Sequence, residues 1–240
     1  MLNSINDYKE CGIIPSSRII GGSSVAKNSI PWQVGILMNG RDIPIDCGGT
    51  LLTAKHVLTA AHCVCVDSVS QDLISPSDIV VVVAEHDQTN AADGTRHTVS
   101  KFNNHPKYDC TGYDNDFSML FLSTNVALGR VAVPACLPPL SYSGDALVGQ
   151  QVKVSGWGSL TQVLVFSSTT TGPPEIPELP VLLQSVDVPV VSQAACTTAY
   201  ANDTRAITDN MICAGIIGTG GKDACQRDSG GKLSKTFWKK

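Results

Sequence analysis

The chain has 240 residues, 42% of them hydrophobic, so it is long and apolar enough to bury a substantial core. It contains no run of eighteen apolar residues, which predicts a soluble globular protein with no membrane partner. The formal net charge is −4 and the pI is about 5.7. We expect no nucleic-acid partner, because binding a phosphate backbone requires clustered Lys and Arg. The one basic cluster, at 232–240, is typical of a solvated or disordered end.

In chain order, the first ten residues lack the charged start and apolar run of a signal peptide, so either the true start lies upstream or a signal has been removed. Short apolar runs separated by Gly and Pro then predict strands at 33–38, 48–52, 79–84, 119–122, 151–155 and 182–188. No long periodic helix interrupts them, which favours an all-β barrel or sandwich. Three consecutive threonines and four prolines at 167–180 predict a long surface loop.

The chain has nine cysteines, too many for an ordinary cytosolic protein. They do not form the repeated Cys-x-x-Cys pairs of a zinc ribbon. The cysteine content therefore predicts an oxidising, extracellular environment.

Three segments carry candidate catalytic residues: TAAHC at 59–63, DND at 114–116 and KDACQRDSGG at 222–231. Peptide hydrolysis by a serine needs a hydroxyl, an imidazole that takes its proton, and a carboxylate that orients the imidazole. The segments supply these groups in the order His62, Asp116, Ser229. Each motif alone is a weak signal, because a Ser in a turn or a His beside a Cys is usually structural.

Together, the three segments resemble those of trypsin-like serine proteases of the chymotrypsin family, and the resemblance extends over residues 11–231. It implies an all-β fold of two antiparallel six-stranded barrels with the catalytic residues at their junction. By position, Ser229 resembles the nucleophile, His62 the general base and Asp116 the orienting acid. Asp114 has the same chemistry at the wrong position of the motif, and we interpret it as a surface turn acid.

The sequence Arg18-Ile19-Ile20-Gly21-Gly22 resembles a zymogen activation junction. By this resemblance residues 1–18 are a propeptide, and residues 19–240 form the protease domain. Cleavage after Arg18 would free the α-amino group of Ile19, which in the family pairs with the acid before the nucleophile, here Asp228.

Two further residues of the third segment have family counterparts. Asp223 resembles the acid at the base of the primary specificity pocket, which implies cleavage after Arg or Lys. The backbone N–H groups of Arg227 and Ser229 resemble the oxyanion hole. The family usually has Gly where this chain has Arg227, and losing one donor there would cost roughly 2.7–4 kcal/mol of transition-state stabilisation.

The resemblance also implies a disulfide pattern. Three pairs match the family: Cys47 with Cys63, Cys196 with Cys213, and Cys11 with Cys136, the last joining the propeptide to the domain. Cys65 and Cys110 have no partner in the common pattern, but their loops should flank the substrate cleft, so we expect them to pair. Cys225 is then left over, because its family partner lies in a region that this chain lacks.

We expect no metal and no cofactor. A zinc site on His62, Cys63 and Cys65 fits no common ligand spacing. The loop at 85–95 resembles the family's calcium loop, but its second acid is replaced near Thr95 and Arg96. Asn202-Asp203-Thr204 is a possible N-glycosylation site.

These expectations combine into a secreted, extracellular serine endopeptidase zymogen that cleaves after Arg or Lys. Its partners would be protein substrates, an activating protease and protein inhibitors. After Gly231 the family continues with a strand and a pocket wall, whereas here Lys232 to Lys240 follow, so we expect a truncated chain with an incomplete second barrel. Two alternatives remain: a non-catalytic protease homologue that binds or regulates other proteins, and a non-functional truncated form.

Overall fold

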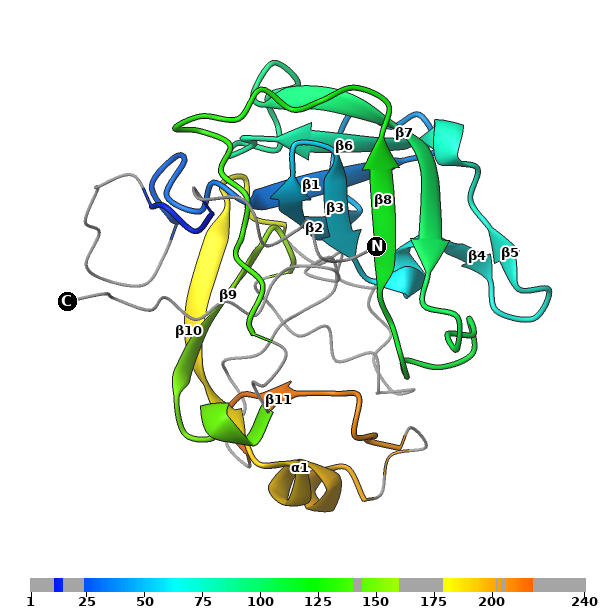
Figure 1. Ribbon diagram of the computed structural model, residues 1–240, viewed down its shortest axis with the longest axis vertical. Helices are drawn as coiled ribbons and strands as arrows, with labels where there is room; N and C mark the ends of the chain where they lie inside the picture. Colours follow the sequence, from blue (N-terminus) through cyan, green and yellow to red (C-terminus); the bar gives the residue numbers. More distant parts are fainter. Residues whose placement is uncertain are drawn as a thin grey trace, which may run out of the picture.

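The structure, a computed structural model, describes residues 11–14, 24–139, 144–159, 179–201, 203 and 206–217 (Figure 1). Strands dominate this part of the chain, and its one α-helix, α1 (Gln193–Ala199), is short. Among these residues, no helix has the length and apolarity needed to cross a membrane. The all-β fold class predicted from the sequence is confirmed.

The first half of the chain forms a closed antiparallel barrel with the strand order β1-β2-β3-β8-β7-β6. Its strands are β1 (Gln33–Met38), β2 (Cys47–Thr53), β3 (His56–Thr59), β6 (Ile79–Val83), β7 (Thr95–Asn104) and β8 (Ser118–Leu122). Because the sheet closes on itself, these strands have no free edges at which another chain could pair. One of the two expected barrels is therefore present in full.

Aliphatic side chains fill the barrel. Those fully shielded from solvent include Val34, Ile36, Leu51, Val57, Ile79, Val81, Leu120 and Leu122. Burying each such side chain contributes roughly 1.5–3 kcal/mol before the loss of conformational entropy. Gly49 leaves room for this packing, because a Cβ there would lie 2.9 Å from a methyl of Val34 and 3.0 Å from one of Val57.

The described residues of the second half form a three-stranded antiparallel sheet in the order β11-β10-β9. Its strands are β9 (Gln151–Gly156), β10 (Gln184–Val191) and β11 (Cys213–Ala214), and α1 follows β10 directly. Ser192 caps α1 by accepting a hydrogen bond from the backbone N–H of Ala195. The described residues therefore form part of the expected second barrel.

Trp157 joins the two halves. Its side chain is fully buried against Leu37 and Val82 of the barrel and Leu183 before β10. Its indole N–H donates to the carbonyl of His86 over 3.2 Å. A buried hydrogen bond of 2.8 Å from Ser155 to Gln33 adds a second link. Because these contacts lie between the barrel and β9, they fix the second sheet against one side of the barrel.

The smaller elements lie in the connections. A two-stranded hairpin, β4 (Cys65–Asp67) and β5 (Asp72–Leu73), follows β3 along the chain and projects to the right of the barrel in Figure 1. The described residues also contain the short 3-10 turns η2 (Ala61–Val64), η3 (Pro76–Asp78) and η4 (Gly144–Leu147). Of these elements, η2 contains His62, and the hairpin follows η2 directly.

Candidate active site

His62 and Asp116 are brought together by strand pairing in the barrel. β3 ends at Thr59, which pairs with Ser118 at the start of β8. His62 lies in η2 just after β3, and Asp116 lies just before β8. The antiparallel register therefore places both residues at the same end of adjacent strands, although they are 54 positions apart in the sequence.

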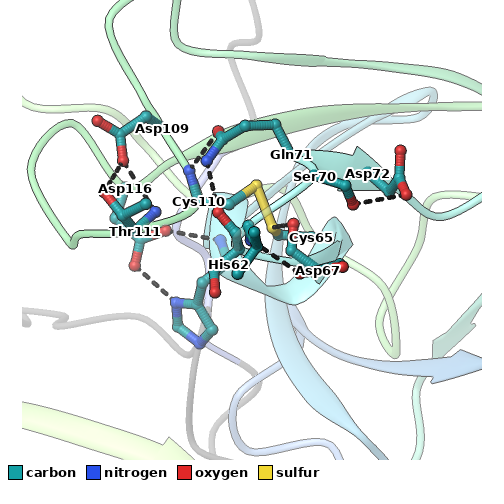
Figure 2. The surroundings of a disulfide bond; sticks show 12 residues. His62, Cys65, Asp67, Ser70, Gln71, Asp72, Asp109, Cys110, Thr111 and Asp116 are labelled. Atoms are coloured by element: carbon teal, nitrogen blue, oxygen red, sulfur yellow. Dashed lines mark hydrogen bonds and ion pairs between the residues drawn. A yellow bond between two sulfur atoms is a disulfide. The ribbon is translucent and has the colours of Figure 1, made fainter.

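Both carboxylate oxygens of Asp116 accept hydrogen bonds from His62. Oδ2 accepts from the ring Nδ1–H over 2.6 Å, and Oδ1 accepts from the backbone N–H over 2.8 Å (Figure 2). A carboxylate can only accept, so the Nδ1 nitrogen must carry the proton. In the neutral ring Nε2 then has the lone pair, which is the state required of a general base.

Partial burial strengthens this pair. The side chain of His62 is 31% exposed and that of Asp116 is 16% exposed. Tyr113 lies edge-on to the imidazole, with ring centroids 5.6 Å apart. The imidazole is thus held by a carboxylate and an aromatic neighbour, yet it keeps an accessible face. Sequence reasoning did not identify Tyr113, which has no motif of its own.

A disulfide lies beside the pair. Cys65 on β4 and Cys110 in the β7–β8 loop are bonded to each other, so the hairpin after His62 is tied to the loop before Asp116 (Figure 2). The side-chain oxygen of Gln71 also accepts a hydrogen bond of 2.9 Å from the backbone N–H of Cys110. These links hold together the two loops that flank the imidazole.

The structure contains the other three expected disulfides as well: Cys47–Cys63, Cys196–Cys213 and Cys11–Cys136. The Cys47–Cys63 bond joins β2 to η2 next to His62, and both of its cysteines are buried. It therefore fixes the backbone of the histidine segment from the side of the barrel core.

These bonds exclude the zinc alternative on His62, Cys63 and Cys65. The potential ligand atoms of Cys47, His62 and Cys63 do lie within 4.8 Å of one another. Zinc requires thiolates, however, and each of the three cysteine sulfurs is already part of a disulfide.

The β6–β7 loop, which resembles a calcium loop, is contacted by two cationic side chains from outside it, those of Lys27 and of Arg96 on β7. Lys27 forms an ion pair with Asp93, and the guanidinium of Arg96 donates to the carbonyl oxygens of Ala91 and Asp42. Calcium binds through six to eight oxygen ligands, and a neighbouring positive charge opposes its binding. Lys27 at Asp93 and Arg96 at the carbonyl of Ala91 place two positive charges at this loop, and these charges oppose the binding of a calcium ion there.

Glu85, at the start of this loop, is a buried acid in an unusual state. It is 7% exposed, and no hydrogen bond to its buried Oε1 is found among the described residues. Burial, and then the charge of Asp93, raise the pKa of Glu85 to about 7. In contrast, hydrogen bonds from Thr89 hold the pKa of Asp87 below its usual range.

Asp114 lies in a turn, as expected from the sequence, but its carboxylate also links this turn to the second half of the chain. Its Oδ1 accepts hydrogen bonds from the hydroxyl of Thr208 and the side-chain amide of Asn210, both in the second half of the chain. Sequence reasoning missed this role because the partners lie more than ninety positions away and form no motif with Asp114.

Several expected functional residues lie outside the described residues. They are the nucleophile and oxyanion-hole candidates, the specificity acid, the activation residues, the unpaired cysteine and the glycosylation site: Ser229, Arg227, Asp223, Arg18, Ile19, Asp228, Cys225 and Asn202. Their assignments stay predictions.

Comparison with known proteins places these features in a family. The family model described as Trypsin matches residues 19–235. The chain is 33% identical to "Trypsin, alkaline B" of Manduca sexta over 219 residues, which is 90% of this chain and 76% of that protein. It is 34% identical to "Trypsin" of Phaedon cochleariae over 218 residues, 90% of this chain and 74% of the relative. It is also 32% identical to human "Mannan-binding lectin serine protease 1", where the match covers 90% of this chain but 29% of the relative.

Asp116→Asn tests the double hydrogen bond to His62. The side-chain amide of Asn keeps one acceptor oxygen, which replaces the Asp116 oxygen that accepts from the backbone N–H of His62. The NH₂ group of the amide then faces Nδ1 of the ring. We expect the neutral ring to change to the Nε2–H tautomer, which ¹⁵N chemical shifts of the His62 ring at alkaline pH would report. The matched control is Asp109→Asn in the same loop, which should leave the ring spectrum unchanged. An unchanged tautomer in Asp116→Asn would contradict this geometry.

Removing the Cys65–Cys110 bond tests its contribution to stability. The bond closes a loop of 45 residues, for which a chain-entropy estimate gives up to about 4 kcal/mol. We expect Cys65→Ala/Cys110→Ala to lower the free energy of unfolding by about 2–4 kcal/mol in urea titrations. An unchanged unfolding midpoint would show that the hairpin and loop are held by other contacts.

Glu85→Gln tests the buried acid through the pH dependence of stability. Because its pKa is raised in the folded state, Glu85 binds more protons when folded than when unfolded between about pH 4.5 and 7. Its contribution to stability therefore falls as pH rises through this window. We expect the variant to have a higher Tm than the wild type at pH 8 and a flatter dependence of Tm on pH. Asp87→Asn is the control, because Asp87 is ionised in both states over that window, and an equal flattening in both variants would refute the assignment.

Proposed function

The chain belongs to the trypsin family, and we propose that it is a serine endopeptidase that hydrolyses peptide bonds with His62, Asp116 and Ser229. The double hydrogen bond from His62 to Asp116 is the observation that carries this proposal, because it sets the ring tautomer that a general base requires. The order of the three residues in the sequence supports Ser229 as the third member.

In the proposed reaction, the hydroxyl of Ser229 attacks the carbonyl carbon of the scissile peptide bond while its proton passes to Nε2 of His62. Asp116 stabilises the imidazolium that forms, and it keeps its own charge throughout. His62 then gives the proton to the leaving amine, and a water molecule releases the acyl group by the same steps. Backbone N–H groups of Arg227 and Ser229 would stabilise the oxyanion.

We further propose that substrates carry Arg or Lys before the scissile bond, with Asp223 as their partner. A desolvated carboxylate in the specificity pocket binds a charged guanidinium or ammonium strongly, whereas an apolar side chain would leave it unpaired. The position of Asp223, six residues before Ser229, supports this role.

The proposed precursor is a secreted zymogen, with residues 1–18 as propeptide and 19–240 as the protease domain. An activating protease would cleave after Arg18, and the new ammonium of Ile19 would pair with Asp228. The Cys11–Cys136 bond supports this arrangement, because it would keep the cleaved propeptide attached to the barrel. The four disulfides support an oxidising, extracellular location. Protein inhibitors that insert into the cleft would be further partners.

One observation favours a second candidate, a non-catalytic homologue that binds other proteins. Arg227 stands where the family usually has Gly, in the turn that would present an oxyanion donor. A displaced N–H there would leave the protein folded with an intact His62–Asp116 pair but with little activity.

The proposal is tested on the full chain after cleavage with immobilised trypsin, which is then removed. We expect a new N-terminus at Ile19 and covalent labelling of Ser229 by a biotinylated phosphonate that bears an Arg side chain. Ser229→Ala should remain unlabelled, and Arg18→Gln should remain uncleaved and unlabelled. Cleaved, folded wild-type protein that takes up no label would support the homologue instead.

The specificity assignment needs its own variant. Asp223→Ser removes the proposed partner of the substrate cation, and losing one member of a buried charge pair costs about 3–5 kcal/mol. We expect kcat/KM for an Arg chromogenic peptide to fall by about a hundred- to several-thousandfold, while that for a Phe peptide falls far less. Equal losses for both peptides would contradict the role of Asp223.

A further inference from the structure

The turn that carries Asp116 also contains a second aspartate with a different set of partners. Asn115 lies between the two acids with a φ of 55°, a left-handed conformation that Asn tolerates better than most residues. The carboxylate of Asp116 binds His62, whereas that of Asp114 binds the 208–210 segment. One short turn therefore connects the imidazole to the second half of the chain.

The carboxylate of Asp114 is well satisfied by hydrogen bonds. Oδ1 accepts from the hydroxyl of Thr208 over 2.5 Å and from the side-chain amide of Asn210 over 3.0 Å. Oδ2 accepts from the side chain of Asn115 over 2.9 Å. The bonds from Thr208 and Asn210 hold the pKa of Asp114 below its usual range, so these are charge-assisted bonds at neutral pH.

The partner segment is itself fixed to the second half. The carbonyl oxygen of Thr208 accepts from the side chain of Gln193 on α1 over 2.6 Å and from the backbone N–H of Met211 over 3.1 Å. Two residues beyond Met211, Cys213 on β11 is bonded to Cys196 on α1. Asp114 thus binds a segment that is anchored to the helix by both a hydrogen bond and a disulfide.

We propose that Asp114 is a positioning residue that fixes the Asp116 turn to the second half of the molecule through Thr208 and Asn210. We call these three residues the latch. The inference rests on the proposed function, in which the His62–Asp116 pair and a nucleophile of the second half act together. Because the latch joins the Asp116 turn to the segment from which the chain continues toward Ser229, its loss changes the alignment of the two halves without removing a reacting group.

The first test compares catalysis in Asp114→Ala, Asp114→Asn and Asp109→Ala. Loss of the latch should lower kcat by about ten- to a hundredfold with little change in KM, because misalignment by about 1 Å has costs of this order. In Asp114→Asn the amide oxygen still accepts from Thr208 and Asn210, so most of the activity should be retained. Asp109 is the matched control, an acid of the same loop whose carboxylate accepts hydrogen bonds from the neighbouring Thr111.

The second test does not depend on activity. The backbone N–H of His62 donates to Asp116, so its hydrogen exchange reports directly on the position of that carboxylate. We expect exchange at this amide to become about tenfold faster in Asp114→Ala and to stay at the wild-type rate in Asp109→Ala. The double variant Thr208→Val/Asn210→Ala removes the partners of Asp114, so it should speed exchange at His62 to the same extent. Adding Asp114→Ala to this double variant should cause no further change in the exchange rate.

Three results would overturn the proposal. The first is wild-type kcat and wild-type exchange in Asp114→Ala, or in the Thr208/Asn210 pair if Asp114→Ala does not fold. The second is an equal loss in Asp114→Asn and Asp114→Ala, which would indicate a role for the charge rather than for the hydrogen bonds. The third is that the effects of Asp114→Ala and of Thr208→Val/Asn210→Ala on exchange at His62 simply add when the variants are combined. An inactive wild type would count against the proposed function alone, because exchange at His62 still tests the latch.

Discussion

The pairing of β3 with β8 is the constraint on which the site depends. Its register sets Thr59 opposite Ser118, and this brings the chain after β3 and the chain before β8 to the same end of the barrel. His62 and Asp116 need to be rigid as well as close, because a carboxylate that accepts from both ring and backbone works only within a narrow range of positions. A barrel with no free edge and a fully buried aliphatic core supplies that rigidity, and the Cys47–Cys63 bond extends it into η2.

Sequence patterns predicted the strands in which buried residues either alternate with exposed ones or follow one another without interruption. The runs at 33–38 and 79–84 became β1 and β6, which consist mainly of buried aliphatic residues. β7 was missed because its ten residues are largely polar and Val99 is its one buried residue, so hydrophobic periodicity gives no signal there. β11, with two residues, is too short for a pattern. The helix α1 was missed for a similar reason, because Cys196 is its one buried residue.

For the site, the sequence predicted what local motifs encode and missed what only tertiary contacts create. His62 and Asp116 lie in recognisable segments, and the structure brings them into direct contact. The Cys65–Cys110 bond, expected because both loops should flank the cleft, is present beside them. The link from Asp114 to Thr208 and Asn210 was not foreseen, because these partners lie more than ninety positions away in the sequence. Tyr113 faces the imidazole from a position that no motif marks.

The acidic β6–β7 loop is stabilised by positively charged side chains of the same protein. Its cations are the side chains of Lys27 and Arg96, so they are covalently part of the chain. A free ion can be removed by a chelator or lost on dilution, whereas a tethered side chain keeps a constant effective concentration at its partner. The ion pairs of this loop are therefore set by the sequence, and they weaken when salt screens the charges.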